Sequence, residues 1–223
     1  MGLCYTVVNR KSEGGFALIA VLDYGAGNLL SVEKALRFLG CEAVATANPD
    51  TLREASAAVL PGVGAFGDAM ACMSRSGLVR PVQDYIRSGR PFLGVCLGLQ
   101  LLFEESEESP GVKGLGVLKG KIRRIPAAPG RKVPHIGWNS LDRVATGGLF
   151  AGLPEHPYVY FVHSYYLKAD DRGVVSATAD YGVTLDAAVR RGNLFATQFH
   201  PEKSGKVGLA ILRNFAELAG EEG

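Results

Sequence analysis

The sequence predicts an α/β fold: a doubly wound, mostly parallel sheet with a partly antiparallel C-terminal section. Three observations lead to this prediction. Short apolar runs alternate with segments of helical periodicity through the first half of the chain. Glycine-bearing turns follow several of these runs, as is typical of β-turn-α units. After residue 111 the segments become shorter and richer in turns, which favours antiparallel strands.

The first half of the chain is expected to supply the parallel strands. Residues 16–22 are all apolar, which suits a strand that is buried on both faces of a sheet. Three further strands are expected at 41–45, 57–60 and 91–95. Helical spacing of apolar residues predicts helices at 29–39, which Gly40 ends, and at 66–73 and 78–86.

The second half is expected to supply the antiparallel section and a final helix. The expected strands are 117–125, 135–144, 158–167 and 173–179, followed by a hairpin of 186–189 with 194–199 around a turn at 190–193. Apolar residues at helical spacing predict the last helix over 204–218.

Length and composition indicate a single globular domain. The chain has 223 residues, of which 47% are apolar and 21% charged, with a net charge of +2. No stripe of Lys and Arg marks a nucleic-acid binder, and no apolar run approaches the roughly 20 residues of a membrane span. We expect the domain to cover residues 16–223, after a flexible extension at 1–15 whose basic residues follow its short apolar stretch, unlike those of a signal peptide.

The cysteines argue against a metal site and against a disulfide framework. Cys4, Cys41, Cys72 and Cys96 show no C-x-x-C spacing and no Cys/His ligand pattern. Free thiols suit a reducing cytoplasm, where we expect the protein. A dinucleotide site is disfavoured as well, because Gly25-Ala26-Gly27 lacks the third glycine of the fingerprint.

Two short motifs are predicted to form one active site. The segment 94–98 places Cys96 between glycines, after a strand and before a helix, as at a nucleophile elbow. The helix start beside the sulfur favours the thiolate. Near the other end of the chain, His200 supplies a base and Glu202 a carboxylate that orients it. A cysteine between glycines is often only a small core residue; the two motifs together favour catalysis.

The same motifs carry a family resemblance. The segments 94–100 and 200–202 resemble the class I (triad) glutamine amidotransferases. Further segments are similar to the glutaminase subunits of imidazole glycerol phosphate synthase, an enzyme of histidine biosynthesis: 23–29, 61–66, 134–139, 163–165 and 197–204. The resemblance covers roughly residues 17 to 220.

This resemblance implies a reaction without cofactor or metal. Cys96 would attack the side-chain amide of glutamine, His200 would pass the proton to the departing ammonia, and water would hydrolyse the thioester. The oxyanion requires donors. The Leu97 N–H at the helix start is one candidate, and the resemblance adds the Val63 N–H, which Gly62 and Gly64 would allow to flip.

Other residues are expected to bind substrate or a partner. Gln100 lies one helical turn after Cys96 and would face the same pocket. The resemblance adds His163, Ser164 and Tyr165 for glutamine, and Lys203, Trp138 and Asn28 for the partner. His135 and His156 are assigned to structure or surface.

The resemblance further implies a heterodimer with a TIM-barrel cyclase, supplied as a separate chain. Ammonia would pass to the barrel, which makes imidazole glycerol phosphate and aminoimidazole carboxamide ribotide. Three alternatives stay open at this point: a class I glutaminase that serves another synthase, a Cys-dependent peptidase-like or chaperone-like protein, and a pure binding module.

Overall fold

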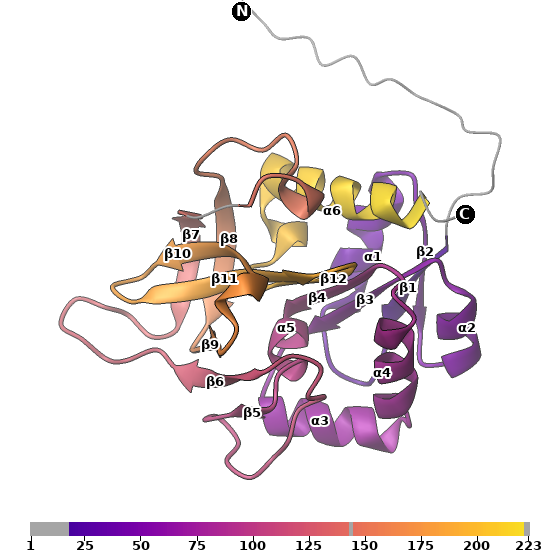
Figure 1. The fold of residues 1–223 in the computed structure, drawn as a ribbon, viewed down its shortest axis with the longest axis horizontal. Coiled ribbons are helices and arrows are strands. Elements are labelled where there is room, and N and C mark those ends of the chain that lie inside the picture. The colour runs from indigo at the N-terminus through magenta and orange to yellow at the C-terminus, as the bar shows by residue number, and fades with distance from the viewer. Residues whose placement is uncertain (1–17, 143–144, 221–223) are drawn as a thin grey trace, which may run out of the picture.

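A ten-stranded mixed sheet runs through the molecule (Figure 1). In this computed structural model, which describes residues 18–142 and 145–220, its order is β2-β1-β3-β4-β12-β11-β9-β6-β5, and β10 also pairs with β11. The first five strands in this order run parallel to one another: β2 (Glu42–Thr46), β1 (Leu18–Leu22), β3 (Ala57–Gly62), β4 (Phe92–Cys96) and β12 (Leu194–Thr197). The predicted fold class is confirmed, whereas the expected extension at 1–15 lies outside the described residues.

Helices cover both faces of the parallel part of the sheet. Val32 and Leu36 of one helix and Phe215 of another share a core with one face. Phe66 and Val82 belong to a second core on the other face. The first pair of helices is α1 (Leu29–Phe38) and α6 (Gly205–Gly220), and the second group is α2 (Pro49–Glu54), α3 (Phe66–Arg75) and α4 (Val79–Arg87). In the described part of the chain, no helix has the length and apolar character needed to cross a membrane.

The antiparallel section differs from the prediction at one important point. The single strand expected at 158–167 is wrong, because the chain changes sheets at Ser164. Strand β8 (Tyr158–His163) pairs with β7 (His135–Ser140) in a separate two-stranded sheet. The following β9 (Tyr165–Ala169) pairs with β6 (Gly120–Arg124) in the main sheet, where the Ser164 carbonyl accepts the Ile125 N–H at 2.9 Å.

Smaller differences have local causes. Helix α2 was not expected, although Asn48 caps it by accepting the Asp50 N–H at 2.8 Å and Pro49 occupies its first turn. The strand expected at 173–179 begins two residues later, after a 3₁₀ turn, as β10 (Val175–Asp180). Strand β7 stops at Ser140, and residues 143–144 of the strand expected there lie outside the described residues. The remaining strands are β5 (Glu105–Ser106) and β11 (Thr184–Arg191), the latter forming the expected hairpin with β12.

The turn after β4 depends on close packing of a short helix against β3. Helix α5 (Leu97–Leu101) begins directly where β4 ends. A Cβ at Gly98 would lie 1.8 Å from the carbonyl oxygen of Leu60, and one at Gly94 would lie 2.9 Å from the Gly98 oxygen. The two glycines around Cys96 therefore serve the close approach of α5 to the sheet.

Replacing Gly98 by alanine should lower the free energy of unfolding by about 3 kcal/mol, because the overlap involves backbone atoms that no side-chain rotation can relieve. Chemical denaturation of the purified chain measures this change. Gly220→Ala is the matched control, since a Cβ there meets nothing within 4 Å. Equal stability of the two variants would contradict this account of the turn.

Candidate active site

Cys96 occupies a strained turn at the carboxyl end of β4. Its backbone lies at φ 55° and ψ −107°, and it is the one non-glycine with positive φ among the residues that the structure describes. Such a conformation costs about 1–3 kcal/mol and persists where the surrounding packing enforces it. The strained backbone angles are those of Cys96 itself, as at the strand-to-helix turns that present a nucleophile.

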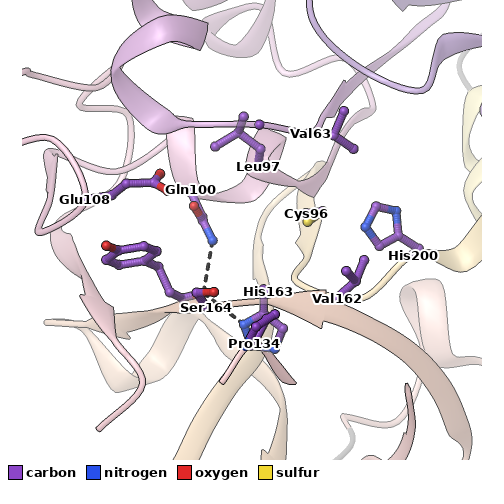
Figure 2. A pocket seen from close by; sticks show the side chains of 12 residues that line it. Val63, Cys96, Leu97, Gln100, Glu108, Pro134, Val162, His163, Ser164 and His200 are labelled. Carbon is purple, nitrogen blue, oxygen red and sulfur yellow. Dashed lines mark hydrogen bonds between the residues drawn. The ribbon is translucent and has the colours of Figure 1, made fainter. Parts of the chain in front are cut away.

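The sulfur opens onto a cavity of about 310 Å³, a volume at the small end of small-molecule sites. Figure 2 shows Cys96 between His200 on one side and Gln100 on the other. Nine of the residues predicted for the site line this cavity: Val63, Gly64, Cys96, Leu97, Gln100, His163, Ser164, Tyr165 and His200. Two residues that the sequence analysis had not singled out, Glu108 and Val162, also line it, as does Pro134.

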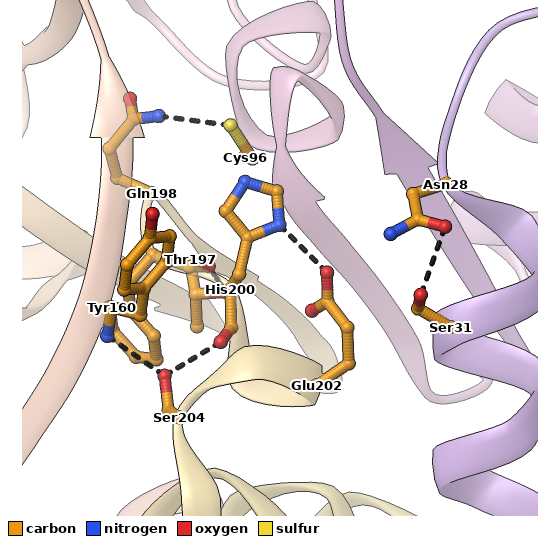
Figure 3. Close-up of polar contacts among 10 residues, drawn as sticks. Asn28, Ser31, Cys96, Tyr160, Thr197, Gln198, His200, Glu202 and Ser204 are labelled. Atoms are coloured by element: carbon orange, nitrogen blue, oxygen red, sulfur yellow. Dashed lines mark hydrogen bonds and ion pairs between the residues drawn. The ribbon is translucent and has the colours of Figure 1, made fainter. Parts of the chain in front are cut away.

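A buried carboxylate holds the imidazole of His200. His200 follows β12, and its Nδ1 lies 2.8 Å from Oε1 of Glu202, with both side chains about 2% exposed. The other ring nitrogen, Nε2, has no hydrogen-bond partner among the described residues. In Figure 3 this nitrogen faces the Cys96 sulfur. The three side chains therefore stand in the order sulfur, imidazole, carboxylate.

This arrangement sets the charge of His200. Burial alone lowers the pKa of His200, but the Cys96 sulfur and the Glu202 carboxylate outweigh burial and raise that pKa to about 9. The imidazole is therefore protonated at neutral pH, with Nδ1–H donating to Glu202. A protonated Nε2 then faces the sulfur, which favours a thiolate–imidazolium pair.

Two backbone segments border the sulfur. Leu97 is the first residue of α5, so its N–H has no acceptor within that helix. On the other side, β3 ends at Gly62, where a Cβ would lie 2.7 Å from the Tyr24 hydroxyl. That hydroxyl donates to the Pro61 carbonyl at 3.0 Å and so fixes the strand end. Gly64 beyond it has φ +101°, a conformation that glycine adopts at no steric cost.

Gln198 was missed as a site residue although it lies in a quoted motif. It is fully buried, and its Nε2 lies 3.7 Å from the Cys96 sulfur. Gln100 donates to Gln198 Oε1 and to the Tyr165 carbonyl, each at 3.1 Å. Glu108 was missed too, because its role is non-local: it accepts the Phe66 N–H at the start of α3 at 2.7 Å.

A pair of neutral histidines supports the opposite wall. His163 Nδ1 lies 2.9 Å from the Tyr165 carbonyl, and its Nε2 lies 3.1 Å from His135 Nδ1. Burial lowers the pKa of His163 to about 3 and that of His135 to about 4. His135, in β7, is thus a buried hydrogen-bond partner of His163, which agrees with the structural role expected for His135 from the sequence. His156 Nδ1 lies 3.3 Å from the Leu141 carbonyl.

The three candidates for partner contacts lie in two separate places: Trp138 and Lys203 are exposed, whereas Asn28 is half-buried. Trp138 of β7 is 55% exposed, and its ring lies 3.7 Å from where a Cβ of Gly205 would be, so it adjoins the turn that carries exposed Lys203. Asn28 precedes α1, where its side-chain oxygen accepts the Ser31 hydroxyl at 3.0 Å. Ile136, in the same strand as Trp138, is also 59% exposed.

Comparisons with known proteins agree with one another. The family model described as glutamine amidotransferase class-I matches residues 20–218. The imidazole glycerol phosphate synthase subunit HisH of Methanothermobacter thermautotrophicus is 53% identical over 201 residues, which cover 90% of this chain and 98% of that protein. The HisH subunit of Syntrophotalea carbinolica is 50% identical over 206 residues, or 90% of this chain and 100% of that protein. A crystal structure of a glutamine amidotransferase, 27% identical, has a TM-score of 0.71 and covers 91% of this chain and 98% of its own.

Replacing Glu202 by glutamine should move the pKa of His200 down from about 9, because a neutral amide no longer stabilises the imidazolium. The chain has four histidines, so their ring signals can be followed separately by NMR titration. His135 and His163 should stay neutral from pH 5 to 10 in both proteins, since burial keeps their pKa values near 4 and 3. The control is Glu105→Gln, which removes a carboxylate that pairs with Lys113 and Lys121, and it should leave the His200 midpoint unchanged. An unchanged His200 midpoint in Glu202→Gln would contradict the role given to Glu202.

Proposed function

Because this chain belongs to the class-I glutamine amidotransferase family, and within it to the HisH subunits of imidazole glycerol phosphate synthase, we propose that Cys96, His200 and Glu202 are its catalytic triad. The chain is a glutaminase subunit of that synthase, in histidine biosynthesis. The observation that supports the triad most strongly is the Cys96 sulfur, held at a strained turn and faced by an imidazole that a buried carboxylate orients.

The first half-reaction forms a thioester. The Cys96 thiolate attacks the carboxamide carbon of glutamine, and the C=O π electrons move onto oxygen to give a tetrahedral oxyanion. His200 gives its Nε2 proton to the departing nitrogen, the C–N bond breaks, and ammonia leaves as the carbonyl re-forms. The Leu97 and Val63 N–H groups are the proposed oxyanion donors, with Gly62 and Gly64 allowing the Val63 peptide to turn.

The second half-reaction restores the enzyme. Neutral His200 takes a proton from water through Nε2, and the hydroxide attacks the thioester carbon. The C–S bond then breaks, which returns the thiolate and leaves a protonated γ-carboxyl group on the product. The product loses that proton to solvent as glutamate, and His200 keeps the proton taken from water. Glu202 accepts the Nδ1–H in both half-reactions and so keeps the imidazole in place.

The far wall of the cavity suits the amino-acid end of glutamine. Both N–H groups of Gln100 are used, on Tyr165 and Gln198, so its Oε1 is the atom left for a ligand. The carboxylate of Glu108 lines the same wall. These two acceptors favour the α-ammonium group, while Ser164 and Tyr165 border the same end of the cavity (Figure 2).

Ammonia made here needs an acceptor on another chain. The name of the HisH relatives describes them as subunits of a synthase, and we propose a TIM-barrel cyclase as the partner of this chain in a heterodimer. Trp138, Lys203 and Asn28 are the proposed contacts. The Val63 peptide offers a gate, because an oxyanion donor that turns into place only in the complex would be worth about 10²–10³ in rate.

The Cys96→Ala variant tests the nucleophile. It should produce no glutamate from glutamine, because no other group is proposed to form the thioester. Its complex with the barrel subunit should still make product when ammonium salts replace glutamine, since the cyclase site is untouched. Near wild-type glutaminase activity in this variant would overturn the assignment. A wild-type chain that makes no glutamate even with its partner would support a peptidase-like protein instead.

Trp138→Ala should weaken binding of the barrel subunit at least tenfold, or about 1.4 kcal/mol, because exposed aromatic residues commonly anchor interfaces. Half-maximal activation of glutamine hydrolysis should then require a correspondingly higher concentration of the barrel subunit. Phe38→Ala is the matched control: Phe38 is 78% exposed but lies at the far end of α1. Titration calorimetry and the glutaminase rate at graded partner concentration measure both effects, and equal behaviour of the two variants would exclude this surface.

A further inference from the structure

Gln198 is a buried polar residue beside the sulfur to which the proposed reaction gives no task. It directly follows β12, its backbone N–H donates to the Ala187 carbonyl at 2.8 Å, and its side chain is fully buried. Burying an amide costs free energy unless the amide is hydrogen-bonded. The contacts of this side chain therefore indicate what it does.

The direction of every hydrogen bond around Gln198 follows from one backbone carbonyl. The Tyr165 oxygen can only accept, so the Gln100 atom beside it must be the donor Nε2. That Nε2 can only donate, so the Gln198 atom that it contacts must be the acceptor Oε1. The remaining Gln198 atom, the NH₂ group, therefore points at the Cys96 sulfur, as Figure 3 shows.

The Tyr165 carbonyl also has a second hydrogen-bond partner, His163. His163 Nδ1 must donate to Tyr165, so its Nε2 accepts, and His135 Nδ1 must donate to it. The amide of Gln198 thus belongs to a chain of bonds in which no member can reverse without leaving a buried donor or acceptor unpaired. The NH₂ group is held toward the sulfur in advance of any substrate.

We propose that Gln198 is a positioning residue that donates a hydrogen bond to the Cys96 thiolate and returns the sulfur to one place in each catalytic cycle. The proposal rests on the proposed role of Cys96 as the nucleophile. The amide and the imidazole of His200 are the two side-chain donors that face the sulfur from the end of β12. The nearby Tyr24 hydroxyl is directed to the Pro61 carbonyl instead. A donor to the ionised sulfur stabilises it more than a neutral contact would.

The test measures the reactivity of Cys96 rather than activity alone. Gln198→Met keeps the length of the side chain and removes the donor, whereas Gln198→Glu keeps the acceptor for Gln100 and places a carboxylate oxygen at the sulfur. Each protein is alkylated with iodoacetamide at a series of pH values from 5 to 10, and mass spectrometry of the Cys96 peptide gives the alkylation rate at each pH. The midpoint of the rise of this rate with pH is then compared between proteins. We expect the midpoint to rise by about one unit, a tenfold change, in Gln198→Met and by more in Gln198→Glu. The kcat for glutamine in the complex with the barrel should fall about tenfold.

Thr197→Val is the matched control for packing in the same segment. The Thr197 hydroxyl is buried and donates to the Phe199 carbonyl at 3.0 Å, away from the sulfur. Its midpoint should equal that of the wild type. Unchanged midpoints in both Gln198 variants, or an equal rise in Thr197→Val, would overturn the proposal and leave Gln198 a packing residue. Failure of the proposed function would instead appear as glutaminase activity in Cys96→Ala, which leaves the alkylation result intact.

Discussion

The backbone conformation of Cys96 is the constraint on which the rest of the site depends. Because β4 turns into α5 within one residue, the sulfur, the first N–H of the helix and the end of β3 come together at one edge of the sheet. The turn is possible only because α5 packs directly on β3, where a Cβ at Gly98 would overlap the Leu60 carbonyl. Pairing of β12 with β4 then brings His200 to the same edge. A strained residue is thus held by packing that continues through the parallel half of the fold.

Environment gives the buried histidines different charge states. His200 has a carboxylate on one side and a sulfur on the other, which keeps it protonated at neutral pH although burial opposes this. His163 and His135 are buried against a carbonyl and against each other, so both stay neutral. The first arrangement provides an acid and base for proton transfer, and the second provides a fixed hydrogen-bond direction. The neutral pair orients the Tyr165 carbonyl, which in turn orients the amides of Gln100 and Gln198 beside the Cys96 sulfur.

The parallel strands of the first half of the chain and the grouping of Cys96, His200 and Glu202 could be predicted from the sequence, because both have local signals. Apolar runs identified β1, β3 and β4, and two short motifs identified Cys96 and His200. The break at Ser164 carried no such signal, since aromatic and apolar residues lie on both sides of it and no glycine or proline marks it; only the pairing partners change. Gln198 and Glu108 were missed for the same reason. Their contacts lie 102 and 42 residues away along the chain, and only the folded sheet brings those residues together.

Conversion of glutamine through a covalent thioester on Cys96 would leave an intermediate that can be trapped. The complex with the barrel subunit can be mixed with glutamine, quenched in acid within the turnover time, digested and analysed by mass spectrometry. We expect a glutamyl adduct on the Cys96 peptide, absent from Cys96→Ala and absent when asparagine replaces glutamine. Steady release of glutamate with no adduct on Cys96, or with the adduct on Cys41 or Cys72, would contradict it.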